Sequence, residues 1–128
     1  MLVEVYRHVA PVLNVCDGVI AMEGNGPSEG DPRPVRVIAA AADAVALDVV
    51  LATLVGFDAE LLRTTRAART LGVGTPDLAD IDVIGAALED WDIRDWKRAD
   101  GMPIFFDPVR VGKSTARQAR YVLGLRTR

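Results

Sequence analysis

The chain has 128 residues, of which half are apolar and only seven are aromatic. This composition fits one domain with a core of small side chains and excludes a disordered chain. The single cysteine, Cys16, excludes an internal disulfide, and its place in an apolar run favours a buried, inert thiol. Asp48 interrupts the longest apolar stretch and Glu4 precedes any hydrophobic run, so we expect no membrane helix and no signal peptide. The sequence therefore predicts a soluble, cytoplasmic protein.

Charge divides the chain into two parts. Residues 1–107 hold nine basic and eighteen acidic side chains, whereas residues 108–128 hold six basic and no acidic ones. We expect a single α/β domain over 1–107 and a basic helix over 108–128 that packs on it or extends from it. A basic tail can meet nucleic acid, an acidic partner or the acidic body of its own chain. Contact with its own body or simple solvation is favoured, and nucleic-acid binding is not expected.

The first half of the chain predicts a helix, a strand, a loop and a second strand. Apolar residues at helical spacing predict a helix over 2–10, which Pro11 ends. Residues 12–16 form a short apolar run typical of a strand buried in a parallel sheet. A glycine-rich loop over 17–30 follows, and residues 35–41 predict the next strand.

Two helices are expected next. Asp43 is a suitable N-cap for a helix that ends near Gly56 and is apolar all round. Asp48, inside that helix, is therefore either buried with a partner or directed into a cavity. Asp58 caps an amphipathic helix over 59–71 that ends at Gly72. The side chains expected to face inward on it are Leu61, Leu62, Thr65, Ala68 and Leu71.

The remaining sequence predicts a third strand over 81–85 and a lid over 89–101 that packs Trp91 and Trp96 on the body. Residues 104–106 suit a fourth strand and residues 114–123 a basic helix. We therefore expect an α/β fold with a small, mainly parallel sheet of three to four strands and helices on both faces. The glycine-rich loop would lie at the carboxyl end of a strand, where such folds bind ligands.

The glycine-rich loop is the main candidate site. Asp17, Glu23, Asn25 and Glu29 supply oxygen donors, and glycines between them permit positive φ and close approach of a ligand. Oxygen donors suit hard cations, so Asp17 and Glu23 are candidate ligands of a divalent metal. Two carboxylates about 4 Å apart repel by roughly 4 kcal/mol at an effective dielectric of 20, so a convergent pair needs a cation, a shared proton or an arginine. The arginines close enough in sequence are Arg33 and Arg36.

A polar substrate is the alternative ligand of this loop, and ordinary turn chemistry with solvated acids is the alternative to any site. Asp43 and Asp48 are five residues apart on one helix and do not share a face, so Asp48 either faces the pocket of the loop or is a hydrogen-bonded structural acid. The motif 112–114 lacks the glycine that a P-loop needs, since Asp107 stands there. The candidate ligand-binding residues are Asp17, Glu23, Gly24, Asn25, Gly26, Asp43 and Asp48.

Several of these motifs together resemble the proteins grouped as domain of unknown function 362, which are associated with iron–sulfur proteins and have no established reaction. The resemblance spans roughly residues 2–85, and rests on 2–11, 15–18, 22–27 with Gly30, 43–48 and 56–57. It implies the C-terminal half of a longer architecture, because family members are about twice as long.

Our first hypothesis is one lobe of a redox-linked or metal-dependent enzyme, in which Asp17, Glu23 and Asn25 bind a divalent cation or a polar substrate and Asp48 supports them. An iron–sulfur cluster needs about four thiolates, so this chain alone is not expected to hold one, and such a role would need a partner chain of the ferredoxin type. The alternative is a non-catalytic assembly module that pairs with a missing N-terminal lobe, a partner chain or another copy as a homo-oligomer.

Overall fold

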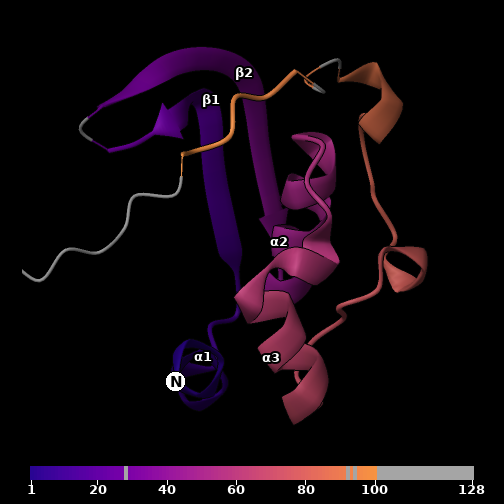
Figure 1. Cartoon of the computed structure of the whole chain (residues 1–128). Helices are drawn as coiled ribbons and strands as arrows, with labels where there is room; N and C mark the ends of the chain where they lie inside the picture. The colour runs from indigo at the N-terminus through magenta and orange to yellow at the C-terminus, as the bar shows by residue number, and fades with distance from the viewer. Residues whose placement is uncertain (28, 92, 94, 101–128) are drawn as a thin grey trace, which may run out of the picture.

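The computed structural model describes residues 1–27, 29–91, 93 and 95–100. Within these residues a long β-hairpin stands beside a group of three α-helices (Figure 1). The predicted strand 104–106 and the basic helix of 108–128 lie outside the described residues.

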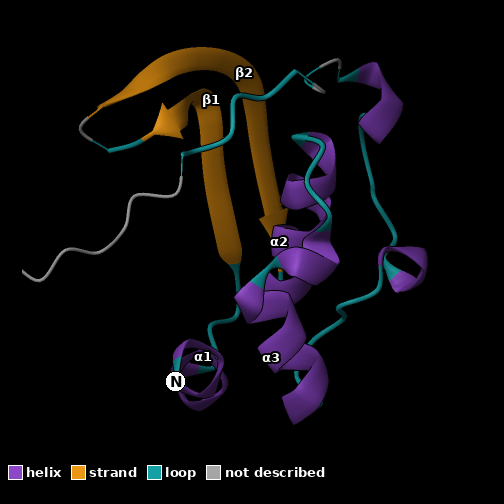
Figure 2. Ribbon diagram, in the orientation of Figure 1, coloured by secondary structure: helices purple, strands orange, loops and turns teal. Residues whose placement is uncertain are grey.

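The hairpin consists of β1, Asn14–Asn25, and β2, Glu29–Ala41, paired antiparallel from Asn14 opposite Ala41 to Asn25 opposite Glu29. Figure 2 shows the two strands in orange, joined at one end by a tight turn. That turn contains a cis peptide bond between Gly26 and Pro27. At the open end, the Asn14 amide donates to the carbonyls of Ala41 and Ala42 at 3.2 and 3.0 Å, which ties the two strands together.

The prediction of a mainly parallel sheet with three to four strands is wrong, because the described sheet has two antiparallel strands. The segment 17–30, expected as a loop, supplies most of β1, the turn and the start of β2 instead. Its residues alternate between the two faces of the sheet, and the turn is short enough to join antiparallel neighbours, whereas parallel strands need a long crossover. Residues 81–85 form no strand; Ile81 to Ile84 instead line a cavity shared with α2 and the end of β2.

The positions of the helices agree better with those predicted from the sequence. Helix α1 spans Leu2–Val9 and ends at Ala10 in the left-handed region, just before Pro11. Helix α2 spans Ala44–Leu54 behind the predicted N-cap, Asp43, which confirms that cap.

The predicted helix 59–71 is divided in two. A 3-10 turn, η1, covers Ala59–Leu61, and helix α3 covers Arg63–Leu71 and ends at Gly72 in the left-handed region. Thr65 and Ala68 are fully buried as expected, but Leu61 is 71% exposed because the break at Leu62 turns it away from the core. Two further 3-10 turns, η2 at Leu78–Asp80 and η3 at Leu88–Asp90, follow.

The core forms two clusters. In one, Val35 and Val37 on the inner face of the hairpin meet Leu54 of α2 and Ile93. Trp91 and Trp96 pack against this cluster, which confirms the predicted packing of both aromatics. In the other, Val3, Val45 and Ala68 join α1, α2 and α3.

Only the inner face of the hairpin is covered by α2 and by the segment that contains the two tryptophans, so the expected helices on both faces are not found in the described chain. The outer face carries apolar side chains that are 44 to 72% exposed. These outer-face side chains are Val15, Val19, Ile20, Met22 and Ile38.

Candidate functional site

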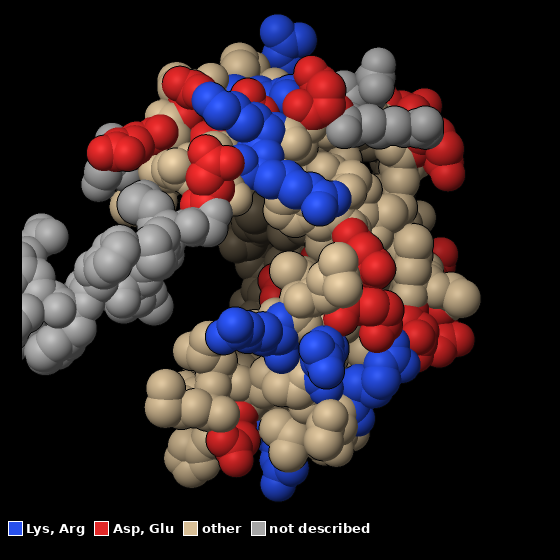
Figure 3. All heavy atoms as spheres, in the orientation of Figure 1, with Lys and Arg blue, Asp and Glu red and all other residues tan. Residues whose placement is uncertain are grey.

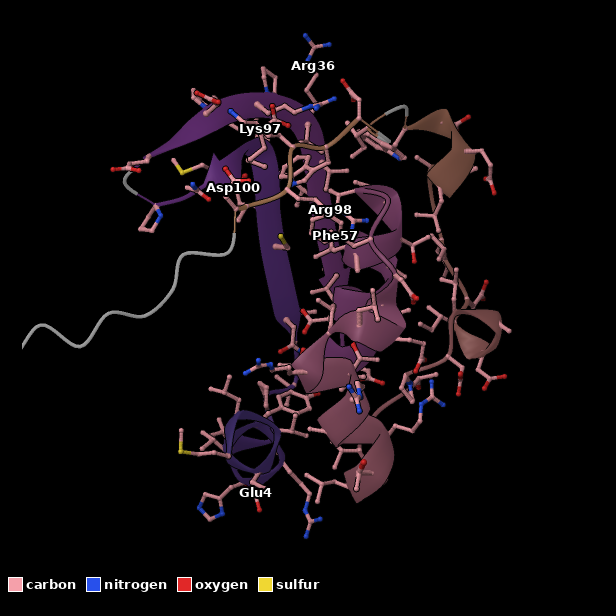
Figure 4. All side chains as sticks on the ribbon, in the orientation of Figure 1. Glu4, Arg36, Phe57, Lys97, Arg98 and Asp100 are labelled. Atoms are coloured by element: carbon pink, nitrogen blue, oxygen red, sulfur yellow. The ribbon has the colours of Figure 1, made fainter. Side chains whose placement is uncertain are left out.

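The turn end of the hairpin is closed by an ion-pair network centred on Arg33 of β2. Its guanidinium donates to the carboxylate of Glu23 on β1 at 2.9 Å and also pairs with Asp95. The Glu23 carboxylate accepts a second hydrogen bond from the backbone N–H of Lys97 at 3.2 Å, and the Lys97 ammonium pairs with Asp31 at 2.8 Å. Figure 4 shows the segment of Lys97 lying across the hairpin. The network anchors residues 95–97 to both strands.

Glu23 is therefore a neutralised, structural carboxylate. Two hydrogen bonds to its carboxylate hold the pKa of Glu23 below its usual value. The larger effect comes from the Arg33 guanidinium and the smaller one from the backbone N–H of Lys97. The sequence offered Arg33 and Arg36 as candidate partners of these acids, and the ion pair identifies Arg33. A cation that bound Glu23 would have to compete with the guanidinium for the same oxygens.

Asp17 lies far from this network. It is six residues from Glu23 on the same strand, which corresponds to roughly 20 Å. One of its oxygens accepts from the N–H of Val19 at 3.0 Å. The structure therefore does not bring Asp17 and Glu23 together, and a metal site shared by the two stays a prediction without geometric support.

The glycines and the amide of the predicted loop form the tight end of the hairpin. Gly24 has φ of 75°, and its N–H donates to the Lys97 carbonyl at 2.9 Å. The side-chain oxygen of Asn25 is buried and has no hydrogen-bond partner among the described residues. At Gly30 an added Cβ would lie 2.5 Å from Cγ of Met22 and 2.8 Å from the Glu23 carbonyl, so this position requires glycine.

Asp43 uses both carboxylate oxygens for structure. One accepts from the N–H of Val45 at 2.8 Å and caps α2, and the other accepts from the N–H of Thr75 at 2.6 Å. Gly74, at φ of 65°, lies so close that an added Cβ would be 2.5 Å from an Asp43 oxygen. Asp43 thereby ties the start of α2 to the segment after α3.

Asp48 has a different environment, because it lines a groove between α2 and the inner face of the hairpin. The groove has a volume of about 430 Å³, and its walls are mostly apolar, with Gly18, Val37 and Leu51 among them. The hollow between the hairpin and the helices is visible in Figure 3. At one end the ring of Phe57 lies beneath the guanidinium of Arg98, at 5.0 Å from the ring centroid (Figure 4). The residues of the hairpin turn do not line this groove.

Asp48 and Thr64 also line a second, smaller pocket of about 130 Å³ at the junction of α1, α2 and α3. Thr65 and Tyr6 contribute hydroxyl groups to its lining. The Asp48 residue as a whole is exposed, yet partial burial of its carboxyl raises the pKa above the usual value, and the nearby Thr64 hydroxyl opposes the shift. A carboxyl in a cleft with a perturbed pKa is a candidate functional group.

A third cavity, of about 220 Å³, lies between α2, the end of β2 and residues 81–91. Its lining is apolar apart from Asp82, so it offers less chemistry than the groove of Asp48.

The chain is similar in sequence to a protein family and to a Synechocystis protein. Residues 1–53 match the family model described as "Domain of unknown function (DUF362)". This match confirms the resemblance that the motifs indicated. The chain is also 38% identical, over 116 residues, to the "Thylakoid-associated protein sll1697" of a Synechocystis species. The alignment covers 90% of this chain but 36% of that relative, so the chain spans about a third of its length. No solved structure matches the chain.

The segment matched by this family model, residues 1–53, contains α1, the hairpin and most of α2, and with them every predicted site residue. These residues fall in separate places: Asp17 on the outer face, Glu23 to Gly26 at the turn, and Asp43 and Asp48 on α2. Their ligand-binding role stays a prediction. Within the described residues, no three His, Cys, Asp or Glu side chains gather in a way that could hold a metal ion.

The sequence did not indicate Tyr6, Thr64 and Thr65 as site residues. Their hydroxyl groups come from helices separated by more than fifty residues, and threonines on an amphipathic helix carry no signal of a pocket. Finally, no helix in the described part of the chain is long and apolar enough to cross a membrane.

Proposed function

We propose that this chain is one lobe of a larger DUF362-like protein and that it acts by binding the remaining part of such a protein. The binding surface would be the outer face of the hairpin together with the edge of β1, which the described residues leave unpaired before Gly24. The observation that carries this proposal is the apolar character of an outer sheet face that the described residues leave uncovered.

The outer face exposes enough apolar side chain to contribute substantially to binding. Val15, Ile20 and Ile38 are 62, 66 and 72% exposed, and burial of such a side chain contributes about 1.5 to 3 kcal/mol when complete. A two-stranded hairpin is also marginal by itself and gains stability from further strands or a second packing layer.

The two edges of the hairpin differ in their ability to accept a strand. Pro32 and Pro34 of β2 have no N–H, and prolines of this kind protect an edge from pairing. Strand β1 contains no proline between Asn14 and Asn25, although Gly24 near its end already donates to Lys97. We therefore assign strand addition to β1, over the part before Gly24.

The length of the relative supports the remaining part of a longer protein as the partner that covers the outer face of the hairpin. The Synechocystis protein extends well beyond the segment that this chain matches, so it has additional chain that could cover the hairpin. A lobe that offers an apolar layer and an edge strand is the partner that fits the exposed surface.

The test mixes this chain with the part of the Synechocystis relative that lies outside the alignment, and measures mass by light scattering after gel filtration. We expect a one-to-one complex that Ile38→Lys prevents. Ile84→Lys is the matched control, since Ile84 is 91% exposed but lies off the hairpin. A complex that both variants form equally well would overturn the proposal. Absence of a complex, or a dimer of this chain alone that Ile38→Lys disrupts, would also reject the assigned occupant.

A second candidate function is binding of a polar substrate or a divalent metal at the hairpin turn, in a redox-linked enzyme served by a ferredoxin-type partner. The unpartnered oxygen of Asn25, buried at this turn, favours it. A thermal-shift series with Mg²⁺, Mn²⁺, Ca²⁺, Zn²⁺ and Fe²⁺ tests it, because ligand binding stabilises the folded state. We expect a shift that Asn25→Ala removes and Asp17→Asn retains, and no shift with any ion counts against a metal.

For the location we propose the cytoplasm. The name of the relative, a thylakoid-associated protein, suggests attachment to a membrane surface as the alternative. Fractionation of cells that express the tagged chain separates the two, since a peripheral protein sediments with membranes and is released by salt.

A further inference from the structure

The small pocket at the junction of α1, α2 and α3 contains a buried polar atom without a partner among the described residues. The Oγ1 atom of Thr65 is buried and makes no hydrogen bond among the described residues, although Thr65 is fully buried. A buried hydroxyl without a partner is costly in a folded protein and marks a place where a ligand can supply the missing bond. Thr65 lines the pocket together with Asp48 and Thr64.

The Asp48 carboxylate is also without a counter-ion. The ion pairs in the described part of the chain involve other acids, and none includes Asp48. On the opposite wall, the hydroxyl of Tyr6 accepts from the N–H of Ala44 at 3.1 Å, which leaves its own O–H free to donate. The pocket thus combines one negative charge with three hydroxyl oxygens.

The pocket and the apolar groove share two lining residues, Asp48 and Thr64. Because Asp48 and Thr64 border both spaces, a molecule whose polar head binds these two side chains has the apolar walls of the groove, between α2 and the inner face of the hairpin, next to it. Among the described residues, Asp48 is the only carboxylate that lines the groove, and the walls offer mainly apolar surface.

We propose that this junction binds a primary ammonium group carried on an apolar chain, with the ammonium at Asp48, Thr64 and Thr65 and the chain in the groove. An ammonium has three N–H donors and no acceptor, which matches a carboxylate flanked by hydroxyl oxygens. Its positive charge complements Asp48, and a hydrogen bond between two charged groups is stronger than one between neutral groups. A carboxylate head would instead be repelled by Asp48. This site is separate from the outer face of the hairpin and does not depend on the proposed assembly.

The probe is hexylammonium, and hexanol and hexanoate are the compounds compared with it. Each is titrated into the full chain, and binding is measured by calorimetry and by changes in amide chemical shifts. We expect hexylammonium to bind and to shift the amides of Thr64 and Thr65, hexanol to bind more weakly, and hexanoate not to bind. Asp48→Asn should weaken hexylammonium by about tenfold or more while leaving hexanol unchanged. Asp17→Asn, an exposed acid on the opposite face of the sheet, is the control and should change nothing.

Thr65→Val gives an independent measure, since it removes the unpaired hydroxyl with little change of shape. We expect it to weaken hexylammonium and not hexanol. Equal binding of hexanoate and hexylammonium, or unchanged hexylammonium binding in Asp48→Asn, would overturn the proposal. Absence of hexylammonium binding to the folded parent chain would overturn it as well.

Discussion

Arg33 and Glu23 face each other across the turn end of the hairpin, with 2.9 Å between the guanidinium and the carboxylate, and both side chains are about four-fifths buried. The pair does more than join β1 to β2. Through Asp95 and the backbone N–H of Lys97 it also attaches the segment that follows the last 3-10 turn. The residue that looked most like a metal ligand in the sequence is thereby an anchor of the tertiary structure.

This relationship predicts an acid-sensitive step in stability. Arg33 lowers the pKa of Glu23 in the folded state below its ordinary value of 4.5. The stabilising contribution is therefore present above pH 4.5 and is lost as the pH falls through the lowered folded-state value. Glu23→Gln should lower the melting temperature at pH 7 and change it little at the acid end of the curve. Thermal melts from pH 7 downward measure this difference.

Glu29→Gln is the matched control for that experiment, because Glu29 is an exposed acid of the same hairpin without an ion pair among the described residues. Its melting curve should follow the parent at every pH. A loss of stability in Glu23→Gln that is the same at all pH values would contradict the proposed role of the charge.

Asp43 offers a second prediction, since both of its oxygens hold backbone N–H groups. Asp43→Ala should lower the free energy of unfolding by about 1 to 2 kcal/mol through loss of the helix cap, with a further loss from the freed N–H of Thr75. Asp43→Asn keeps one acceptor oxygen and should retain part of the stability. Urea unfolding of the parent and the two variants gives the order of their free energies of unfolding. An Ala variant as stable as the parent would rule out the capping role.

The contrast between Asp43 and Glu23 shows what the sequence could predict. An N-cap depends on a residue and the two or three that follow it, so Asp43 and the start of α2 could be identified from local pattern alone. The pairing of Glu23 with Arg33, Asp95 and Lys97 depends on residues up to 74 positions apart in the chain, and only the nearest partner was predictable.

The hairpin was missed for a related reason. Residues 17–30 contain four glycines, a proline and several acids, a composition that usually indicates a loop. In the structure two of these glycines lie within the strands, at places where the neighbouring side chains are close. Gly18 is buried opposite Val37, and Gly30 lies against Met22 where no side chain fits. Strand formation by such residues is decided by pairing with β2, which single-residue preferences do not encode.

Gly30 therefore leads to a third prediction. In Gly30→Ala the new methyl group would meet both the Met22 side chain and the Glu23 carbonyl, and we expect a loss of about 1 to 3 kcal/mol from this overpacking. Adding Met22→Ala relieves one of the two contacts and should restore part of the loss, while the backbone contact remains. Chemical denaturation of the single and double variants measures the recovery. Equal stability of Gly30→Ala and the parent would mean that the strands do not approach as closely as the structure has them.

The last prediction concerns the orphan hydroxyl in the core of the helical part. Thr65 is fully buried, yet its Oγ1 makes no hydrogen bond among the described residues, so its desolvation is not offset. Thr65→Val replaces that hydroxyl by a methyl group of similar size and should leave the chain as stable as the parent or raise its stability by up to about 1 kcal/mol. Thr65→Ala removes volume as well and should lower stability by about 1 kcal/mol or more, because it leaves a cavity beside Ala68. Melting curves of the two variants without added amine separate the effects of polarity and volume. A Val variant less stable than the Ala variant would show that the hydroxyl has a structural partner, and it would remove the main support for an amine site at this junction.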